Sequence, residues 1–372
     1  MSIRSSNMKE INDSSNHKHE RLLGLDVVRT LAIICVIGGH FFNISSNTQF
    51  NSWPFTGVGM FLLGMLQTFT YIGVPLFLML TGYLNINKTE PTRKYYHGIW
   101  RVLIAYLFFS VVAIWYREFF LDEHKSILQW CHAIAYFGAN PYAWYIELWI
   151  GLFLLTPFLN QMWHAIESKR HRQVLLATLF ICSSVPDFTN RYGYQLMPGY
   201  WVDAAYPLLC FFLGCYFRTY KPTYRPQKLL LIILALCLFN PVGSMILAPG
   251  RPMLHLQGDP KGVISMPIAV CTFLLLYQTD LKSRGWRTLV TKISVLSLDM
   301  YLAAWIVDQI VYPVFKARFG EGPNMLVPLY PVIVATLVAG CFAVAYAKDI
   351  LFKGVSVACK GLTQKKRELA ES

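Results

Sequence analysis

Charged side chains are scarce in this sequence. Only 14% of its 372 residues are Asp, Glu, Lys or Arg, whereas soluble domains carry about 25%. The same chain is 55% hydrophobic and 15% aromatic, and its mean hydropathy is +0.41. These values argue against a soluble protein and indicate a membrane protein.

Cysteine pairs are also missing. None of the nine cysteines stands in a CxxC pair, so the sequence predicts neither a disulfide framework nor a zinc site, and no other metal site is indicated. Most of the cysteines lie inside apolar runs and are interpreted as small core residues: Cys35, Cys182, Cys210, Cys215, Cys237, Cys271 and Cys341.

The first 20 residues lack the apolar core and the small-residue cleavage site of a secretory signal peptide. We predict that residues 1–20 form a disordered cytoplasmic tail. One membrane domain is predicted over residues 21–352, followed by a basic cytoplasmic tail at 353–372. The sequence contains no evident internal repeat, and no loop is long enough for a further domain.

Long apolar runs follow the first tail. About 20 apolar residues cross a bilayer as a helix. The run from Phe55 to Leu84 is too long for one crossing, and its Gly73 and Pro75 predict a break, with the preceding part at the membrane interface. The ten predicted helices are centred near Ile33, Pro75, Phe108, Phe153, Leu179, Phe211, Leu234, Phe273, Trp305 and Val338.

Basic residues indicate the orientation of these helices, because cytoplasmic loops are enriched in Lys and Arg. With the N-terminus inside, 25 of the 33 Lys and Arg residues fall on the cytoplasmic side, seven fall outside, and Arg29 lies within the first helix. We therefore predict an all-α, multi-pass plasma-membrane protein with about ten helices and both termini in the cytoplasm. Since the basic residues are clustered between apolar runs, the charge of +13 does not indicate a nucleic-acid partner.

The first apolar run contains an aspartate, an arginine and a histidine in an otherwise membrane-like stretch, LDVVRTLAIICVIGGH. The step from Arg29 to His40 leaves the two side chains about 20° apart on one helix face and about 16 Å apart along the axis. Asp26 precedes Arg29 by three residues, a spacing that allows an ion pair. Two interpretations are open: the pair anchors the helix at the interface and His40 is a satisfied polar residue, or the imidazole faces the bundle interior and carries protons.

Four stretches resemble a known family. LDVVRTLAIICVIGGH (residues 25–40) is similar to the opening motif of the acyltransferase type 3 family, in which a basic residue precedes the essential histidine. The other stretches resemble that family's second-helix signature, its aromatic-led helix ending in Thr-Pro, and its late Ser-x-x-x-Tyr segment. They are VPLFLMLTGYL (74–84), WYIELWIGLFLLTPFL (144–159) and SLDMYLAAW (297–305).

The resemblance implies a membrane enzyme that transfers an acyl group, most commonly acetyl, from cytoplasmic acyl-CoA to a hydroxyl of a cell-surface glycan. His40 is expected to act as the general base or as a nucleophile. The phosphates of the coenzyme are expected at Arg29, steadied by Asp26, and at Lys94 and Arg101. Lys94 and Arg101 are equally typical of cytoplasmic loops in general.

Residues near the opposite end of the predicted helices are candidates for holding the acceptor. Glu147 is an intramembrane acid that would orient His40 or bind a sugar hydroxyl, and Asp308 has a similar position on a later helix. Trp144 and Tyr145 would contact the sugar, although such aromatic residues are also typical of the membrane interface. Further acids, weaker as candidates, are Asp203 and Asp299.

The sequence departs from the family pattern at two places. Tyr142 and Ala304 stand where members often carry histidines, which leaves His40 as the candidate proton carrier. A proton-coupled transporter or a polysaccharide exporter is the alternative function, since either would also contain intramembrane acids and a histidine. Against it, the two halves of the chain show no inverted repeat.

Overall fold

The computed structural model describes residues 22–43, 52–190, 195–253 and 260–371. These residues form helices and no β-strand, which confirms the predicted all-α class for this part of the chain. The predicted N-terminal tail lies outside the described residues. The helices are α2 (Leu23–Asn43), α3 (Gly57–Thr70), α4 (Gly73–Asn85), α5 (Arg93–His97), α6 (Ile99–Phe120), α7 (Ile127–Ala135), α8 (Trp144–Ala165), α9 (Lys169–Thr189), α10 (Val202–Tyr220), α11 (Pro226–Leu247), α12 (Ser265–Leu276), α13 (Arg284–Phe319) and α14 (Pro323–Glu371).

Within the described residues, six helical stretches are long and apolar enough to cross a membrane. The predicted centres near Phe153, Leu179, Phe211 and Phe273 are helical as well, but their helices α8, α9, α10 and α12 do not satisfy that test. The count of ten and the orientation of the termini remain predictions. The six stretches are Leu23–Phe42, Gly57–Asn85, Arg93–Phe120, Pro226–Leu247, Arg284–Phe319 and Leu326–Gly354.

The long apolar run between Phe55 and Leu84 is broken where the sequence predicted. Helix α3 ends at Thr70 and α4 begins at Gly73, with two turn residues between them. Helix α3 packs against α2 and α11 within the bundle, which is not the placement expected of an interfacial helix.

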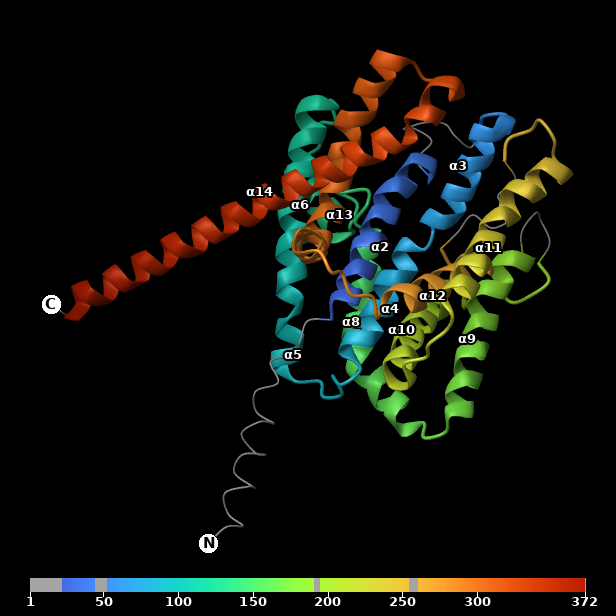
Figure 1. Ribbon diagram of the computed structural model, residues 1–372. Coiled ribbons are helices and arrows are strands. Elements are labelled where there is room, and N and C mark those ends of the chain that lie inside the picture. The colour runs from blue at the N-terminus through green and yellow to red at the C-terminus, as the bar shows by residue number, and fades with distance from the viewer. Residues whose placement is uncertain (1–21, 44–51, 191–194, 254–259, 372) are drawn as a thin grey trace, which may run out of the picture.

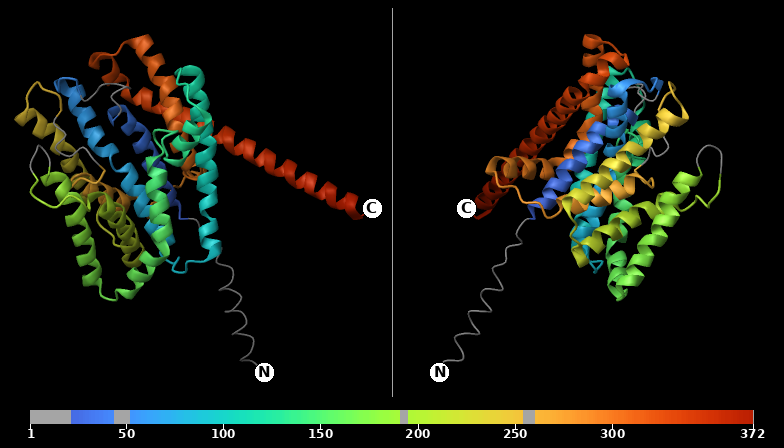
Figure 2. Two further views of the ribbon diagram at one scale, coloured as in Figure 1. Left: turned by 180° about the vertical axis from the view of Figure 1, so that it is seen from behind. Right: turned by 45° about the vertical axis from the view of Figure 1, so that its right-hand side comes forward.

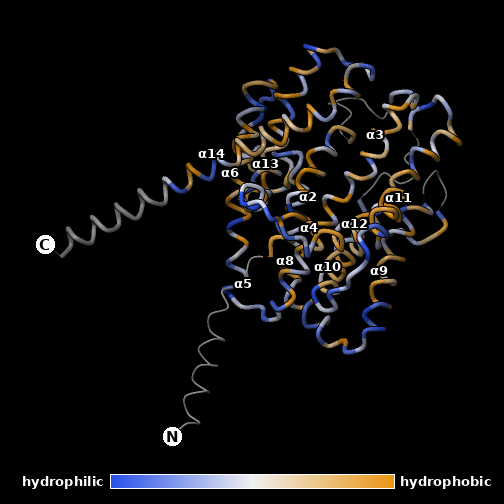
Figure 3. The backbone as a smooth tube through the Cα atoms, in the orientation of Figure 1, coloured by the Kyte–Doolittle hydropathy of each residue, from blue (hydrophilic) through white to orange (hydrophobic). Residues whose placement is uncertain are grey.

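Helix α2 lies inside the bundle and contacts α3, α4, α12, α13 and α14 (Figure 1). Apolar positions run along the bundled helices, and hydrophilic positions gather at their connections (Figure 3). The connection between α8 and α9 lies at one end of the bundle and the turn between α13 and α14 at the other. Helix α14 continues past the bundle through residues 353–371 (Figure 2).

Helices α4 and α10 approach each other backbone to backbone at two glycines. A Cβ atom on Gly82 would lie 1.9 Å from the carbonyl oxygen of Phe211, and one on Gly214 would lie 2.0 Å from that of Met79. Real side chains do not tolerate such distances, so only glycine permits this contact. Small residues serve the same purpose in membrane helix pairs generally.

We expect Gly214→Ala to destabilise the protein by at least about 2 kcal/mol, because the new methyl group must push two backbones apart. Thermal unfolding of the purified protein in detergent measures the effect. Gly151→Ala is the matched control, since nothing lies within 4 Å of a Cβ placed at Gly151. Equal melting temperatures for the two variants would contradict the assignment.

Candidate functional site

The polar end of α2 is tied to α13 by a serine. Ser294 Oγ donates a hydrogen bond of 2.6 Å to Asp26 Oδ1 and accepts one of 3.3 Å from Arg29 Nη1. Thr30 Oγ1 adds a 3.1 Å bond to the carbonyl oxygen of Val290. Asp26 is buried, and the serine bridge fixes the carboxylate and the guanidinium one helical turn apart on the same side of α2.

Arg29 lines a cavity of about 490 Å³ between α2, α4, α6, α8 and α13, which we term the Arg29 cavity. Arg101 also lines it. Lys94 does not: it is exposed on α5, outside the lining residues. The polar side chains of this lining are Arg29, Thr81, Asn85, Arg101, Tyr145, Ser294, Ser297 and Tyr301.

Near the other end of α2, the imidazole of His40 faces a buried acid from α13. His40 Nδ1 lies 3.2 Å from Asp308 Oδ2, and the two side chains are 12% and 0% exposed. The two atoms are close enough for ion pairing but are not aligned as a direct hydrogen bond. Because a carboxylate faces Nδ1, the tautomer with the proton on Nδ1 is favoured, which leaves Nε2 as the basic nitrogen.

Tyr142 completes this group. Its hydroxyl donates a 2.6 Å hydrogen bond to Asp308 Oδ2, and its ring lies against the imidazole of His40 with 4.0 Å between centroids. The hydrogen bond fixes the orientation of the carboxyl group, and the ring restricts how the imidazole turns. His40, Asp308 and Tyr142 therefore form one connected unit from three elements.

The loop that carries Tyr142 is fastened to its neighbours. Asn140, which is fully buried, donates to the carbonyl oxygen of Leu302 on α13 at 2.9 Å and accepts from the backbone N–H of Tyr142 at 3.1 Å. Arg117 donates to the carbonyl oxygens of Gly138 and Ala139, 3.1 Å each. Side-chain hydrogen bonds from Arg117 also lower the pKa of Glu123 in the loop after α6.

A second cavity, of about 260 Å³, surrounds the imidazole, and we term it the His40 cavity. Trp144 lines it, as predicted for an acceptor-side residue, whereas Tyr145 lines the Arg29 cavity instead. Glu147 is exposed and lines neither cavity. Of the two candidate acids, Asp308 is therefore the one that lies beside His40. The lining residues are Cys35, Val36, Gly39, His40, Thr70, Tyr71, Val74, Pro141, Tyr142, Trp144, Pro260 and Tyr301.

The two weaker acidic candidates lie elsewhere. Asp299 is paired with Lys348 on α14 at 2.8 Å, which joins α13 to α14. Asp203 is 89% exposed and is paired with Lys261 at 2.7 Å. Neither lines the Arg29 cavity or the His40 cavity.

The Arg29 cavity and the His40 cavity are stacked along the same four helices. On α2, α4, α8 and α13 the residues that line one cavity lie further along the axis than those that line the other. Along α2 and α13 the residues of the Arg29 cavity come first in the sequence, whereas along α4 and α8 the residues of the His40 cavity come first. This order is expected if α4 and α8 run antiparallel to α2 and α13 and the two cavities lie one above the other. Pairs that illustrate this, with the Arg29-cavity residue first, are Arg29 and His40, Phe77 and Val74, and Phe153 and Trp144; on α13, Ser294 lines the Arg29 cavity and Tyr301, further along, lines both.

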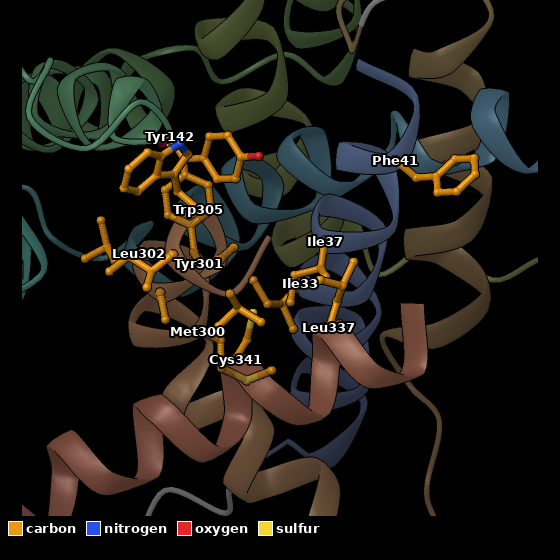
Figure 4. Packing of buried hydrophobic residues seen from close by; sticks show 14 of the residues in the cluster. Ile33, Ile37, Phe41, Tyr142, Met300, Tyr301, Leu302, Trp305, Leu337 and Cys341 are labelled. Carbon is orange, nitrogen blue, oxygen red and sulfur yellow. The ribbon is translucent and has the colours of Figure 1, made fainter. Parts of the chain in front are cut away.

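Sequence reasoning missed the contacts of three residues of this site. Tyr142 was noted only as the absence of a histidine, Tyr301 only as part of an aromatic segment, and Ser294 not at all. Figure 4 shows Tyr142, Tyr301 and Trp305 gathered at one level of the core. The available signal for Tyr301 was its place in the segment SLDMYLAAW.

The family model of the type 3 acyltransferases, described as an acyltransferase domain, matches residues 22–346. No curated protein and no solved structure matches the chain. The matched range includes every residue that lines the two cavities.

Proposed function

The chain belongs to the acyltransferase type 3 family and is a multi-pass membrane acyltransferase, and from this premise we propose that it is an O-acetyltransferase of the plasma membrane. Its donor is acetyl-CoA from the cytoplasm, and its acceptor is a hydroxyl of a cell-surface glycan or of the lipid-linked precursor. Membership of an acyltransferase family favours this function over a transporter or an exporter.

The observation that carries the proposal is the column of two cavities with Arg29 in one and His40 in the other. A donor made on one side of the membrane and an acceptor held on the other need a shared point at which they meet. Two cavities that are stacked along the same helices, with the basic residues in one and the imidazole in the other, supply that arrangement.

The Arg29 cavity suits the donor. Arg29 and Arg101 offer guanidinium groups, which bind phosphate oxygens in pairs. Ser294 and Asp26 hold Arg29 in place, so little side-chain entropy is lost when the donor binds. Coenzyme A is far longer than this cavity. Only its pantetheine arm and thioester would enter, and the nucleotide would stay outside, where Lys94, exposed on α5 shortly before the lining residue Gly98, would be a candidate partner.

The reaction we propose at His40 is a single acyl transfer. Nε2 removes the proton of the acceptor hydroxyl while the hydroxyl oxygen attacks the thioester carbonyl carbon. The new C–O bond forms, the C–S bond breaks, and the thiolate of coenzyme A takes the proton from the imidazolium. Asp308 stabilises the imidazolium, and the hydrogen bond from Tyr142 holds Asp308 in place.

The same residues also allow a two-step route. His40 Nε2 would attack the thioester carbonyl carbon, so that a C–N bond forms, the C–S bond breaks and coenzyme A leaves as its thiolate, which takes a proton from solvent. The oxygen of the acceptor hydroxyl would then attack the acyl group, so that the C–O bond forms, the C–N bond breaks and the hydroxyl proton is released to solvent. Both routes use the same tautomer of His40. Rapid chemical quenching of the enzyme with radiolabelled acetyl-CoA in the absence of acceptor distinguishes them, because only the second route leaves label on the protein.

The proposed function is tested on the product. Surface glycans from cells with and without this protein are compared by mass and by content of base-labile ester. We expect mass differences of one acetyl group or multiples of it, lost on mild alkaline treatment. Glycans that are identical in both cells, with the protein present in the membrane, would contradict the proposal.

We expect Arg101→Gln to raise the KM for acetyl-CoA roughly tenfold or more with little change in kcat, since a hydrogen bond to a charged phosphate contributes about 1.5–3 kcal/mol. Initial rates in membranes at varied donor concentration provide the measurement. Lys228→Gln is the control, because Lys228 is exposed on α11 and lines neither cavity. An unchanged KM in Arg101→Gln would remove Arg101 from the donor site.

A further inference from the structure

One side chain lies between the two cavities. Among the described residues, Tyr301 alone lines both the Arg29 cavity and the His40 cavity. It is 4% exposed, so its ring is enclosed by protein on its remaining sides. In the proposed reaction, an acyl group that comes from the Arg29 cavity therefore meets this ring before it reaches His40.

The position of the ring follows from the sequence of α13. Ser294, Ser297 and Tyr301 follow one another on one face of the helix, at steps of three and four residues. The two serines are small and leave space, which contributes to the Arg29 cavity, and the tyrosine ends that space. The size of the side chain at position 301 thus sets where the Arg29 cavity stops.

Tyr301 is also held in place. Its hydroxyl donates to the carbonyl oxygen of Tyr142, and its ring meets that of Tyr145 edge to face, with 5.6 Å between centroids. Its neighbours on α13, Met300 and Leu302, are fully buried. A ring held by these contacts between the two cavities does not shift easily to admit a longer chain.

We propose that Tyr301 is the specificity-determining residue for the acyl chain, and that its ring restricts the transferred group to short acyl chains. The inference rests on the proposed function and extends it to the class of donor. The His40 cavity, at about 260 Å³, is smaller than ligand pockets of 300–1,000 Å³ and must also receive the acceptor hydroxyl. The ring of Tyr301 occupies volume that borders both cavities, so its removal would provide space for a longer acyl chain next to His40.

The test compares acetyl-CoA with butyryl-CoA as donors for the wild type, Tyr301→Ala and Tyr301→Phe, with kcat/KM measured in membranes. One methylene group changes discrimination in an enclosed site by about 10–200-fold. We expect the acetyl to butyryl ratio of kcat/KM to fall at least tenfold in Tyr301→Ala. Tyr301→Phe keeps the ring and loses only the hydroxyl, so its ratio stays within about threefold of the wild type.

Leu298→Ala is the matched control. Leu298 lies on α13 less than one turn from Tyr301 and lines only the Arg29 cavity, so its truncation enlarges that cavity and leaves the ring in place. Its ratio is expected to match the wild type. An equal fall in Leu298→Ala and Tyr301→Ala, or a ratio unchanged in Tyr301→Ala, overturns the proposal.

Binding of acetyl-CoA, butyryl-CoA and free coenzyme A to the purified variants keeps the inference testable if Tyr301→Ala or the less drastic Tyr301→Leu turns over too slowly. We expect both variants to bind butyryl-CoA at least tenfold more tightly relative to acetyl-CoA than the wild type does. If the variants bind free coenzyme A as tightly as the wild type but show no change in relative affinity for butyryl-CoA, the role of Tyr301 is refuted and the proposed donor still stands. If the wild type binds neither coenzyme A nor its esters, the proposed donor fails, and this inference fails with it.

Discussion

Replacement of His40 by alanine lowers acyl transfer to the glycan by at least about 100-fold and leaves the protein folded and inserted. A positioned general base contributes about 10²–10⁴-fold, and loss of a nucleophile would remove even more. The effect on stability is small because the imidazole already borders an open cavity. Acyl transfer in membranes, together with the amount of inserted protein and its melting temperature, measures both expectations.

Two further experiments make this result specific to His40. His171→Ala removes an exposed histidine at the start of α9, away from both cavities, and is expected to retain full activity. Free imidazole added to His40→Ala is expected to restore part of the rate, because the vacated space adjoins the His40 cavity. Glycan acylation at the wild-type level in His40→Ala would end the catalytic assignment.

Asp308→Asn is expected to lower kcat by about 100-fold or more with the KM for acetyl-CoA unchanged. The amide keeps the volume of the acid and can still accept from Tyr142, but it does not stabilise an imidazolium or select the Nδ1 tautomer. The corresponding change in a Ser-His-Asp triad lowers kcat by about 10⁴. The KM is expected to stay constant because Asp308 does not line the Arg29 cavity.

The control for this variant lies on the same helix. Asp299→Asn removes an acid that is paired with Lys348 and lines neither cavity. It is expected to affect thermal stability and to leave kcat near the wild-type value. If both substitutions reduce kcat equally, the loss arises from α13 as a whole, and Asp308 has no special role beside His40.

Some of this site is predictable from sequence because it depends on local rules. The break between α3 and α4 follows from the backbone preferences of Gly73 and Pro75 and from the length of a bilayer crossing. The common face of Arg29 and His40 follows from helix periodicity alone. Each needs only residues that are close together in the chain.

The rest of the site depends on which helices become neighbours. Glu147 and Asp308 look alike in sequence, as acids flanked by apolar and aromatic residues, yet one is exposed and the other is fully buried beside His40. Only the packing of α13 against α2 distinguishes them. Tyr142 is missed for the same reason, since its contact with Asp308 joins residues 166 positions apart. Ser294 carries no signal at all, because a serine in a helix is commonplace.

The amide of Asn140 has a mechanical consequence. It joins the loop before α8 to the carbonyl oxygen of Leu302, so the loop that bears Tyr142 is held directly against α13. A tilt of α13 would therefore carry Asp308 and the loop that bears Tyr142 together, which favours a constant spacing between the acid and the phenol.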